Sequence, residues 1–464
     1  MIDLNNLGQY RENNRIEAKM ALGGLPHSIW ETYSAFANTL GGLILLGVVE
    51  YPDKSLHAVD LPDPEGMVRT FWELVNDPGV ASVNILSAKD ITVETADGRR
   101  IIVVNVPRAE RTVKPVFVEG SPRNTYRRSG EGDYRCTAEE YQAMVRDAAV
   151  RTQDMRVREE LDADALNAES VRAYRRRMRL SRPEHAWESL ADEDFLLKLG
   201  ALGVGGDGRT HPTSAGLLMF GNGRDIVRAF PHYLLDYSGA ERLVSSSGDW
   251  SGNVFDFYFR ADRRLQQDAR ALPAPVRAAV REALANCLVN ADYCGGGALT
   301  IVRRGNALTM TNPGHFRIEL ATAKSGGLSD PRNGAMSEMF RLIDIGERVG
   351  GGIPTIFRVW RERGWAEPTI TQSFAPDRTT LSLVFGKADG QKQPVKLSDE
   401  LIRARQKNAV IEYLTDNAAA GTSEIADALG VGTTRARAVL SALIAEDIVI
   451  AEGGGRSRTY RLKS

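Results

Sequence analysis

The sequence has few cysteines, no long apolar run and almost no net charge. Its three cysteines, Cys136, Cys287 and Cys294, are odd in number and lack metal-ligand spacing. This argues against a disulfide framework or a zinc site and fits a reducing compartment. No apolar run approaches the roughly 18–20 residues that span a bilayer, and the polar N-terminus has no apolar signal core. A cytoplasmic protein is therefore expected.

The 59 basic and 60 acidic side chains leave a formal net charge of −1. A nucleic-acid-binding protein with this balance must use local basic clusters, because the field of the whole chain does not attract phosphate. The 464 residues suffice for about two to four domains. The composition, with 42% hydrophobic and 26% charged residues, is that of an ordinary folded protein.

Hydrophobic patterning divides the chain into four segments and predicts a multidomain protein of the α/β (α+β) class. In the first segment, residues 1–150, we expect a buried strand at 40–50, a hairpin at 91–106 that turns at Asp97-Gly98, and a helix at 138–152. In the second, residues 151–275, we expect a helical linker at 151–170 and short strands at 216–220 and 232–237.

The remaining two segments have clearer outlines. Residues 276–387 combine a helix at 275–293, a hairpin at 298–312 that turns at Gly305-Asn306, glycine-rich loops and a strand at 380–385, which together indicate an α/β sandwich. A polar linker at 387–394 leads to the last segment, 395–464. That segment has a helix at 401–417, two short helices and a two-stranded end, the outline of a winged helix-turn-helix.

Three carboxylates in the first segment are candidates to converge at one end of a sheet: Glu12, Glu17 and Glu50. Such hard oxygen ligands suit Mg²⁺ or Mn²⁺, which activate water and clamp phosphate. Lys19 would offset their charge or contact phosphate. The spacing alone favours solvated surface charges.

The strings around these residues are R-E-x4-E-x-K, from Arg11 to Lys19, and S-A-F-A-N-T-x-G-G-x-I-x-x-G-V, from Ser34 to Val48. Over residues 8–145 they resemble the AlbA-like domain of Schlafen proteins and their bacterial relatives. The resemblance implies a nucleic-acid domain in which Glu12 and Glu17 match the acidic triad of nuclease-active Schlafens. Glu50 stands where that triad has Asp, and so adds one methylene. Many bacterial relatives resemble regulators, so both roles stay open.

A basic cluster follows in the same segment. Arg123, Arg127 and Arg128 surround Tyr126, with Arg135 nearby. Arginines that contact phosphate and a tyrosine that stacks on bases would suit a nucleic-acid strand. The alternative is a solvated face with a tyrosine in the core.

The third segment carries a second set of candidate residues. Glu282 and Asn286 are four residues apart on the helix expected at 275–293 and therefore share one face, which Asn290 extends. Glu282 would polarise a water, and Asn286 would hold a Mg²⁺ that bridges phosphates. Downstream, three consecutive glycines at 350–352 open a helix and would offer backbone N–H groups to phosphate.

The order of these motifs resembles a GHKL-type ATPase module over residues 276–387. The resemblance implies ATP with Mg²⁺ as cofactor, Glu282 as general base, Asn286 as Mg²⁺ ligand, and a phosphate loop at Gly350, Gly351 and Gly352. Asn312 and Gly314 stand where the usual module has an Asp-containing motif that reads adenine. The alternative is a degenerate module kept as a dimerisation scaffold.

In the last segment, Thr422–Leu429 and Thr433–Glu446 would form the helix-turn-helix. Arg435 and Arg437 lie early in the recognition helix, and Arg456 and Arg458 follow a glycine-rich wing. These positions predict contact with DNA. A winged helix used for protein contact or dimerisation is the alternative.

Three functions fit these modules, and they share one fold, so only geometry separates them. The first is an ATP-binding, DNA-binding transcriptional regulator that works as a homodimer. The second is an ATP-gated, metal-dependent nuclease acting on RNA or single strands, for which phage defence is one candidate role. The third is a scaffold with degenerate sites. The nuclease requires the three carboxylates within reach of one metal, and the regulator requires an exposed recognition helix.

Overall fold

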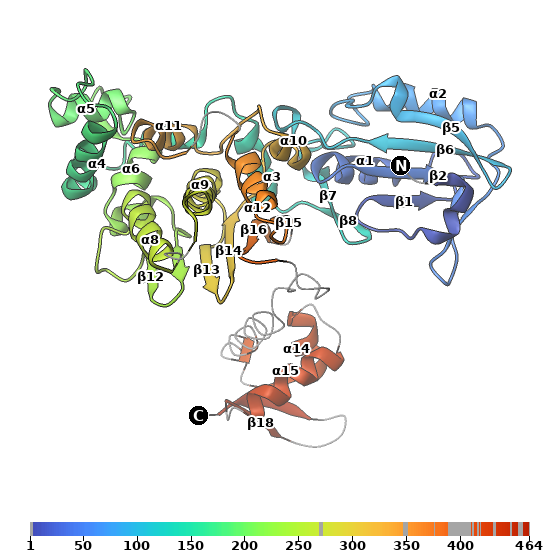
Figure 1. Ribbon diagram of the computed structural model, residues 1–464. Coiled ribbons are helices and arrows are strands. Elements are labelled where there is room, and N and C mark those ends of the chain that lie inside the picture. Colours follow the sequence, from blue (N-terminus) through green and yellow to red (C-terminus); the bar gives the residue numbers. More distant parts are fainter. Residues whose placement is uncertain are drawn as a thin grey trace. The chain divides into compact units, whose positions relative to one another are not determined.

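The computed structural model forms two compact units, Met1–Lys387 and Ala388–Ser464. It describes residues 3–268, 272–346, 351–374, 376–387, 410, 413–414, 417, 419–429, 433–445, 448–452 and 458–463. The chain is a mixed α/β multidomain protein, as the patterning predicts (Figure 1). Within the described residues, no helix is long and apolar enough to cross a bilayer.

The N-terminal part of the first unit is built on a four-stranded sheet in the order β1-β2-β6-β5, drawn in blue in Figure 1. Strands β1 and β2 are parallel, and the other two pairs are antiparallel. The sheet and the elements beside it are β1 (Ile16–Lys19), α1 (Ile29–Asn38), β2 (Gly42–Leu46), β3 (Val48–Glu50), β4 (Leu56–Ala58), α2 (Pro64–Val75), β5 (Ile91–Ala96), β6 (Arg99–Val106), β7 (Tyr126–Ser129), β8 (Gly132–Arg135) and α3 (Ala138–Ala148).

Strand β2 is apolar throughout because both of its faces are covered. Ile44 and Leu46 pack on the α1 side, whereas Leu45 joins a second cluster around Leu7. The strand expected at 40–50 is in fact two strands, since Gly47 has φ +82 and turns the chain into β3. The β5–β6 hairpin turns at Asp97-Gly98 as predicted.

The rest of the first unit surrounds a six-stranded sheet in the order β12-β11-β13-β14-β16-β15. One hydrophobic core extends from Leu161 to Leu383, so the intermediate segment packs together with the module that follows it. The elements are α4 (Ala168–Ser181), α5 (Asp192–Leu199), β9 (Leu202–Val204), β10 (Thr210–Pro212), α6 (Ser214–Phe220), α7 (Gly223–Ala229), β11 (Leu235–Ser238), β12 (Arg242–Val244), α8 (Val254–Asp268), α9 (Ala274–Asn290), β13 (Leu299–Arg304), β14 (Ala307–Pro313), α10 (Leu320–Ser325), α11 (Gly334–Leu342), α12 (Gly352–Glu362), β15 (Thr369–Phe374) and β16 (Asp377–Val384).

Two predictions for the intermediate segment are wrong. Residues 216–220 belong to helix α6, which Thr213 caps by accepting a hydrogen bond from the Gly216 backbone N–H. Every residue of α6 is buried, so no polar face reveals the helical period. The linker at 151–170 contains only short 3₁₀ turns, at Gln153–Met155 and Ala163–Ala165, before α4 begins.

The second unit has a three-stranded sheet in the order β17-β19-β18 and two described helices. Their bounds are β17 (Ala420–Gly421), α14 (Thr422–Leu429), α15 (Thr433–Ala445), β18 (Val449–Glu452) and β19 (Thr459–Leu462). The residues expected to form the 387–394 linker and the 401–417 helix lie mostly outside the described part of the chain.

Candidate nucleotide and carboxylate sites

The first candidate site forms where α9 and α12 pack together. Gly352 is the first residue of α12, and a Cβ atom added there would lie 2.2 Å from Glu282 Oε1 and 2.6 Å from Asn286 Nδ2. Only glycine lets the start of α12 approach these two side chains so closely. Asn286 Nδ2 donates to Glu282 Oε1 at 3.1 Å. The side-chain amide oxygen of Asn286 is therefore the atom that could accept a hydrogen bond or meet a cation.

Two cavities adjoin at this point. One is an apolar slot between the helices and the sheet, lined by Cys287, Met310, Ile353, Ile356, Phe357, Ile370 and Leu381. The other is a more polar pocket of about 260 Å³, lined by residues that include Glu282, Ser329, Asp330, Arg341 and Gly352. Asn286 and Asn290 line both cavities. An apolar slot that continues into a polar pocket at a helix N-terminus has the chemistry for a base and its phosphates.

The structure brings most of the predicted nucleotide residues together. Asn312 is buried in the wall of the apolar slot, and the Gly314 carbonyl accepts from Thr379 Oγ1 at 2.9 Å behind it. Gly351 caps the start of α12. Gly350 lies outside the described residues.

His315 also lines the apolar slot, although no motif in the sequence marks it. Its Nε2 donates to the Ser373 carbonyl at 2.6 Å. Burial lowers the pKa of His315 to about 3, so the ring is neutral at physiological pH. A neutral imidazole adds a polar edge to the slot without adding a charge.

The second candidate site is the carboxylate cluster of β1 and β3. Glu12 Oε1 accepts from the Ala18 backbone N–H at 2.9 Å. Burial raises the pKa of Glu12, and the negative charges of Glu17 and Glu50 raise it further. The three predicted carboxylates therefore lie close enough to share one electrostatic field.

Lysine and arginine side chains form ion pairs with two of these carboxylates. Glu17 accepts from Lys19 at 3.0 Å and from Arg128 at 2.8 Å, and Glu50 accepts from Lys54 at 3.0 Å through Oε2. Glu50 Oε1 is buried and has no hydrogen-bond partner among the described residues. In the part of the chain that the structure describes, no group of three or more His, Cys, Asp or Glu side chains is arranged to hold a metal ion.

Two residues of the predicted basic cluster are wrongly assigned. Tyr126 is only 4% exposed, and its hydroxyl donates to Glu31 Oε1 at 2.9 Å, so its ring is unavailable for base stacking. Arg128 is 2% exposed, because it bonds to Glu17, Asp133 and the Asn13 carbonyl. Arg127 is paired with Glu140. Arg123 is exposed, as a phosphate-binding residue requires.

In the C-terminal unit, Arg437 is exposed on α15, the helix predicted to read DNA. Arg458 is also exposed and lies over the Tyr460 ring, 5.7 Å from its centroid. The side chain of Arg435 and the whole of Arg456 lie outside the described residues.

Family comparisons match four consecutive parts of the chain. Residues 12–137 match the family described as Schlafen AlbA_2, and residues 296–383 match the C-terminal domain of putative ATP-dependent DNA helicase RecG. The second match begins after the helix that carries Glu282 and Asn286. Residues 142–236 match a domain of unknown function, and residues 406–451 match a FaeA-like protein family. No curated protein shows a significant match.

Two solved structures show limited similarity to this chain. The DIP2311 protein from Corynebacterium diphtheriae is 18% identical over 97% of this chain and 95% of its own, with a TM-score of 0.38. The N-terminal domain of a putative ATP-dependent DNA helicase RecG-related protein from Nitrosomonas europaea is 32% identical over 30% of this chain and 96% of its own, with a TM-score of 0.24. By the family matches, the chain belongs to the Schlafen AlbA_2 family through its N-terminal domain and joins that domain to one of the RecG C-terminal type.

Proposed function

We propose that the protein is an ATP-binding switch that binds nucleic acid, most simply a DNA-binding transcriptional regulator. The observation that carries the proposal is the seating of Gly352 against Glu282 and Asn286, beside an apolar slot. The slot, about 40 Å³ in volume, would have to widen to take the base beside the buried Asn312 side chain, whose Nδ2 donates to the Pro313 carbonyl at 3.1 Å. The N-terminus of α12, with Gly351 and Gly352, would meet the phosphates.

The residues around the phosphate pocket fit a magnesium nucleotide. The Asn286 amide oxygen is a hard ligand, and the pocket also holds the carboxylates of Glu282 and Asp330. A triphosphate beside these negative charges needs a counter-cation. When bound there, Mg²⁺ would offset the phosphate charge, while Glu282 would orient a water molecule.

Contacts between the nucleotide module and the AlbA domain support a switch. Arg108 donates to the Phe316 carbonyl at 2.6 Å, and Phe316 lines both cavities of the nucleotide site. Arg111 pairs with Asp330, which lines the phosphate pocket. A ligand that displaces Phe316 or Asp330 would therefore act on the AlbA domain through two arginines.

Fluorescence titration of the full chain with a labelled ATP analogue in Mg²⁺ tests this proposal. We expect saturable binding that unlabelled ATP reverses and GTP reverses less well, because Asn312 would read the edge of the base. A full chain that is folded and shows no binding would overturn the proposal. A symmetric dimer, expected for this class of module, would be checked by light scattering in the same samples.

A second candidate function is a metal-dependent nuclease gated by ATP, acting on RNA or single strands. One observation favours it: Glu50 Oε1 is buried and lacks a partner, next to the field of Glu12 and Glu17. This function requires Glu12, Glu17 and Glu50 to come within reach of one ion, with Lys19 beside them, because the structure does not arrange them to hold one. Wild type and Glu17→Ala would be incubated with tRNA and single-stranded DNA in Mn²⁺, with and without ATP. Cleavage by wild type alone supports this function, and its absence from both excludes it.

A further inference from the structure

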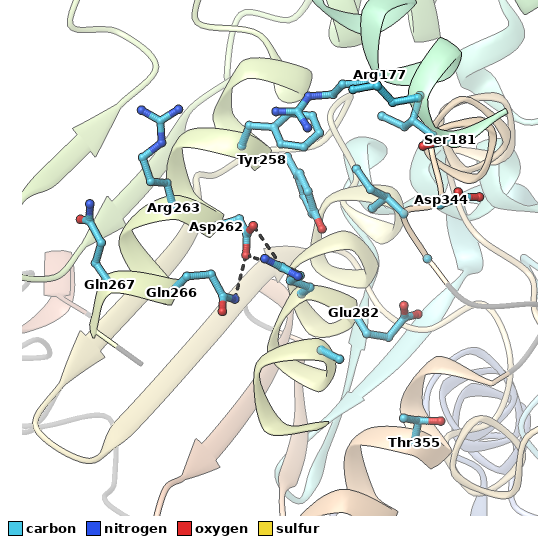
Figure 2. A pocket seen from close by; sticks show the side chains of 17 residues that line it. Arg177, Ser181, Tyr258, Asp262, Arg263, Gln266, Gln267, Glu282, Asp344 and Thr355 are labelled. Atoms are coloured by element: carbon cyan, nitrogen blue, oxygen red, sulfur yellow. Dashed lines mark hydrogen bonds and ion pairs between the residues drawn. The ribbon is translucent and has the colours of Figure 1, made fainter. Parts of the chain in front are cut away.

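A wide cleft of about 950 Å³ lies between α4 and α8 and ends at Glu282 (Figure 2). Helix α4 contributes Arg177 and Ser181, helix α8 contributes Phe259 and Arg263, and Thr355 of α12 lies at the far end. Glu282 lines this cleft and also the phosphate pocket. The cleft therefore opens onto the phosphate end of the proposed nucleotide site.

Helix α4 and its C-cap hold many positive charges and a single negative one, Glu169. Three of its arginines are in ion pairs: Arg175 with Asp192, Arg179 with Glu188, and Arg182 with Asp344. The other three, Arg172, Arg176 and Arg177, are exposed and have no ion pair within the described chain.

The mouth of the cleft gathers positive charge from two helices. Arg177 loses solvation there, which lowers its pKa, and the charges of Arg263 and Arg176 lower it further. Three acidic residues also line the cleft. Asp262 is bound to Arg281 at 3.1 Å and to Gln266 at 2.9 Å, Asp344 is paired with Arg182 at 3.5 Å, and Glu282 lies at the end of the cleft. Arg263 is exposed and has no ion pair in the part of the chain that the structure describes. An anionic ligand would relieve this repulsion.

The guanidinium of Arg177 is also held in a defined plane. Its central carbon lies over the Phe259 ring, 3.4 Å from the ring centroid. A guanidinium backed by an aromatic ring presents its other face for stacking, and unpaired bases stack on such planes. Charged groups alone would suit any polyanion, whereas this platform favours one that carries flat bases.

We propose that the cleft binds a single-stranded nucleic acid, with a phosphate at Arg263 and a base stacked on Arg177. This inference rests on the proposed function, because it places the nucleic acid beside the nucleotide that would control it. It differs from the AlbA and C-terminal surfaces, since it assigns the contact to α4 and α8.

The test is fluorescence anisotropy of the full chain with labelled oligo(dT) and oligo(U) over a range of salt concentrations. Arg177→Ala/Arg263→Ala, two arginines that line the cleft, is the test variant. Its matched control is Arg224→Ala/Arg228→Ala, two exposed arginines of α7 without ion pairs in the described chain. We expect about tenfold weaker binding and a salt slope reduced by about 1 to 2 in the test variant, and little change in the control. Arg177→Lys keeps the charge but removes the plane, and we expect it to weaken binding as well.

The outcomes separate this inference from the proposed function. If test and control variants bind the oligonucleotides equally well and still bind ATP, the cleft inference fails and the proposed function stands. A wild type that binds ATP but no strand overturns the inference and the nucleic-acid part of the proposal. A test variant that loses only self-association, measured by light scattering, assigns the cleft to a second copy of the chain and overturns the inference. Strand binding that depends on the arginines in a protein without ATP binding keeps the inference and rejects the nucleotide proposal.

Discussion

The two candidate sites differ in what surrounds their polar groups. One is the carboxylate cluster of the AlbA sheet, and the other is the pocket between α9 and α12. In the cluster, Glu17 and Glu50 are already paired with lysine and arginine side chains. In the pocket, a glycine, an apolar slot and a helix N-terminus leave space beside Glu282 and Asn286. Satisfied ion pairs hold a sheet edge together, whereas an open cavity with few polar groups is the form of a ligand site. The nucleotide pocket is therefore the better supported of the two sites.

The sharpest way to test this contrast is to remove Arg128 from the cluster. Replacement by Met would leave Glu17 and Asp133 without their buried partner, at a cost of about 3–5 kcal/mol of unfolding free energy. Urea denaturation, followed through tryptophan fluorescence, measures it. The exposed Arg123→Met serves as control and should change stability by no more than about 0.5 kcal/mol. Equal stability of both variants would show that the cluster is not a structural network.

In the pocket, the largest effect is expected from Gly352→Val. The added side chain displaces the Glu282 carboxylate and the Asn286 amide, so ATP affinity should fall about 100-fold, near 2.7 kcal/mol. The control is Gly296→Ala, where a Cβ atom meets nothing within 4 Å. Both variants are checked for an unchanged melting temperature before titration. Wild-type affinity in a folded Gly352→Val protein would place the nucleotide elsewhere.

A smaller effect should distinguish the two polar side chains of the pocket. Asn286→Ala removes the oxygen expected to meet the metal, so affinity should fall about tenfold in Mg²⁺ and little in EDTA. Glu282→Gln should bind ATP about as well as wild type and lose any turnover. Calorimetric titration with and without Mg²⁺ measures the binding. A metal-independent loss in Asn286→Ala would show that the residue shapes the pocket without meeting a metal.

A separate effect, on stability, concerns pH and His315. Its pKa in the folded chain is about 3, against an ordinary value of 6.5, so its neutral form stabilises the fold above pH 6.5. This contribution is lost as the pH falls from 6.5 toward 3, by up to about 1 kcal/mol per pH unit. Asp377 acts in the opposite sense: burial raises its pKa to about 6, so its contribution is largest at low pH and is lost as the pH rises through 6. His315→Gln should flatten the fall in stability between pH 6.5 and about 5, measured by urea denaturation. Parallel pH profiles of wild type and variant would contradict it.

Local signals explain what could be predicted from the sequence. The two hairpins were predicted at their turns because Asp97-Gly98 and Gly305-Asn306 favour left-handed backbone. The i, i+4 spacing placed Glu282 and Asn286 on one helical face, and the contact with Gly352 agrees with that placement.

The errors come from packing between distant segments. Tyr126 looks like an exposed stacking residue, yet Glu31 and Ser34 of α1 bind and cover it. Helix α6 is surrounded on all sides by the core, which removes the alternation that would identify it. The α4–α8 cleft is lined by residues from helices that are distant in the sequence, so no local motif predicts it.

Nucleotide in the α9–α12 pocket is expected to control nucleic-acid binding. The most direct test is the affinity of the full chain for oligo(dT) and oligo(U) with and without ATP, in wild type and in Gly352→Val. The account predicts that ATP changes the wild-type affinity by at least about fivefold, and that it leaves the variant unchanged. Equal affinities for wild type in the presence and absence of saturating ATP would contradict it.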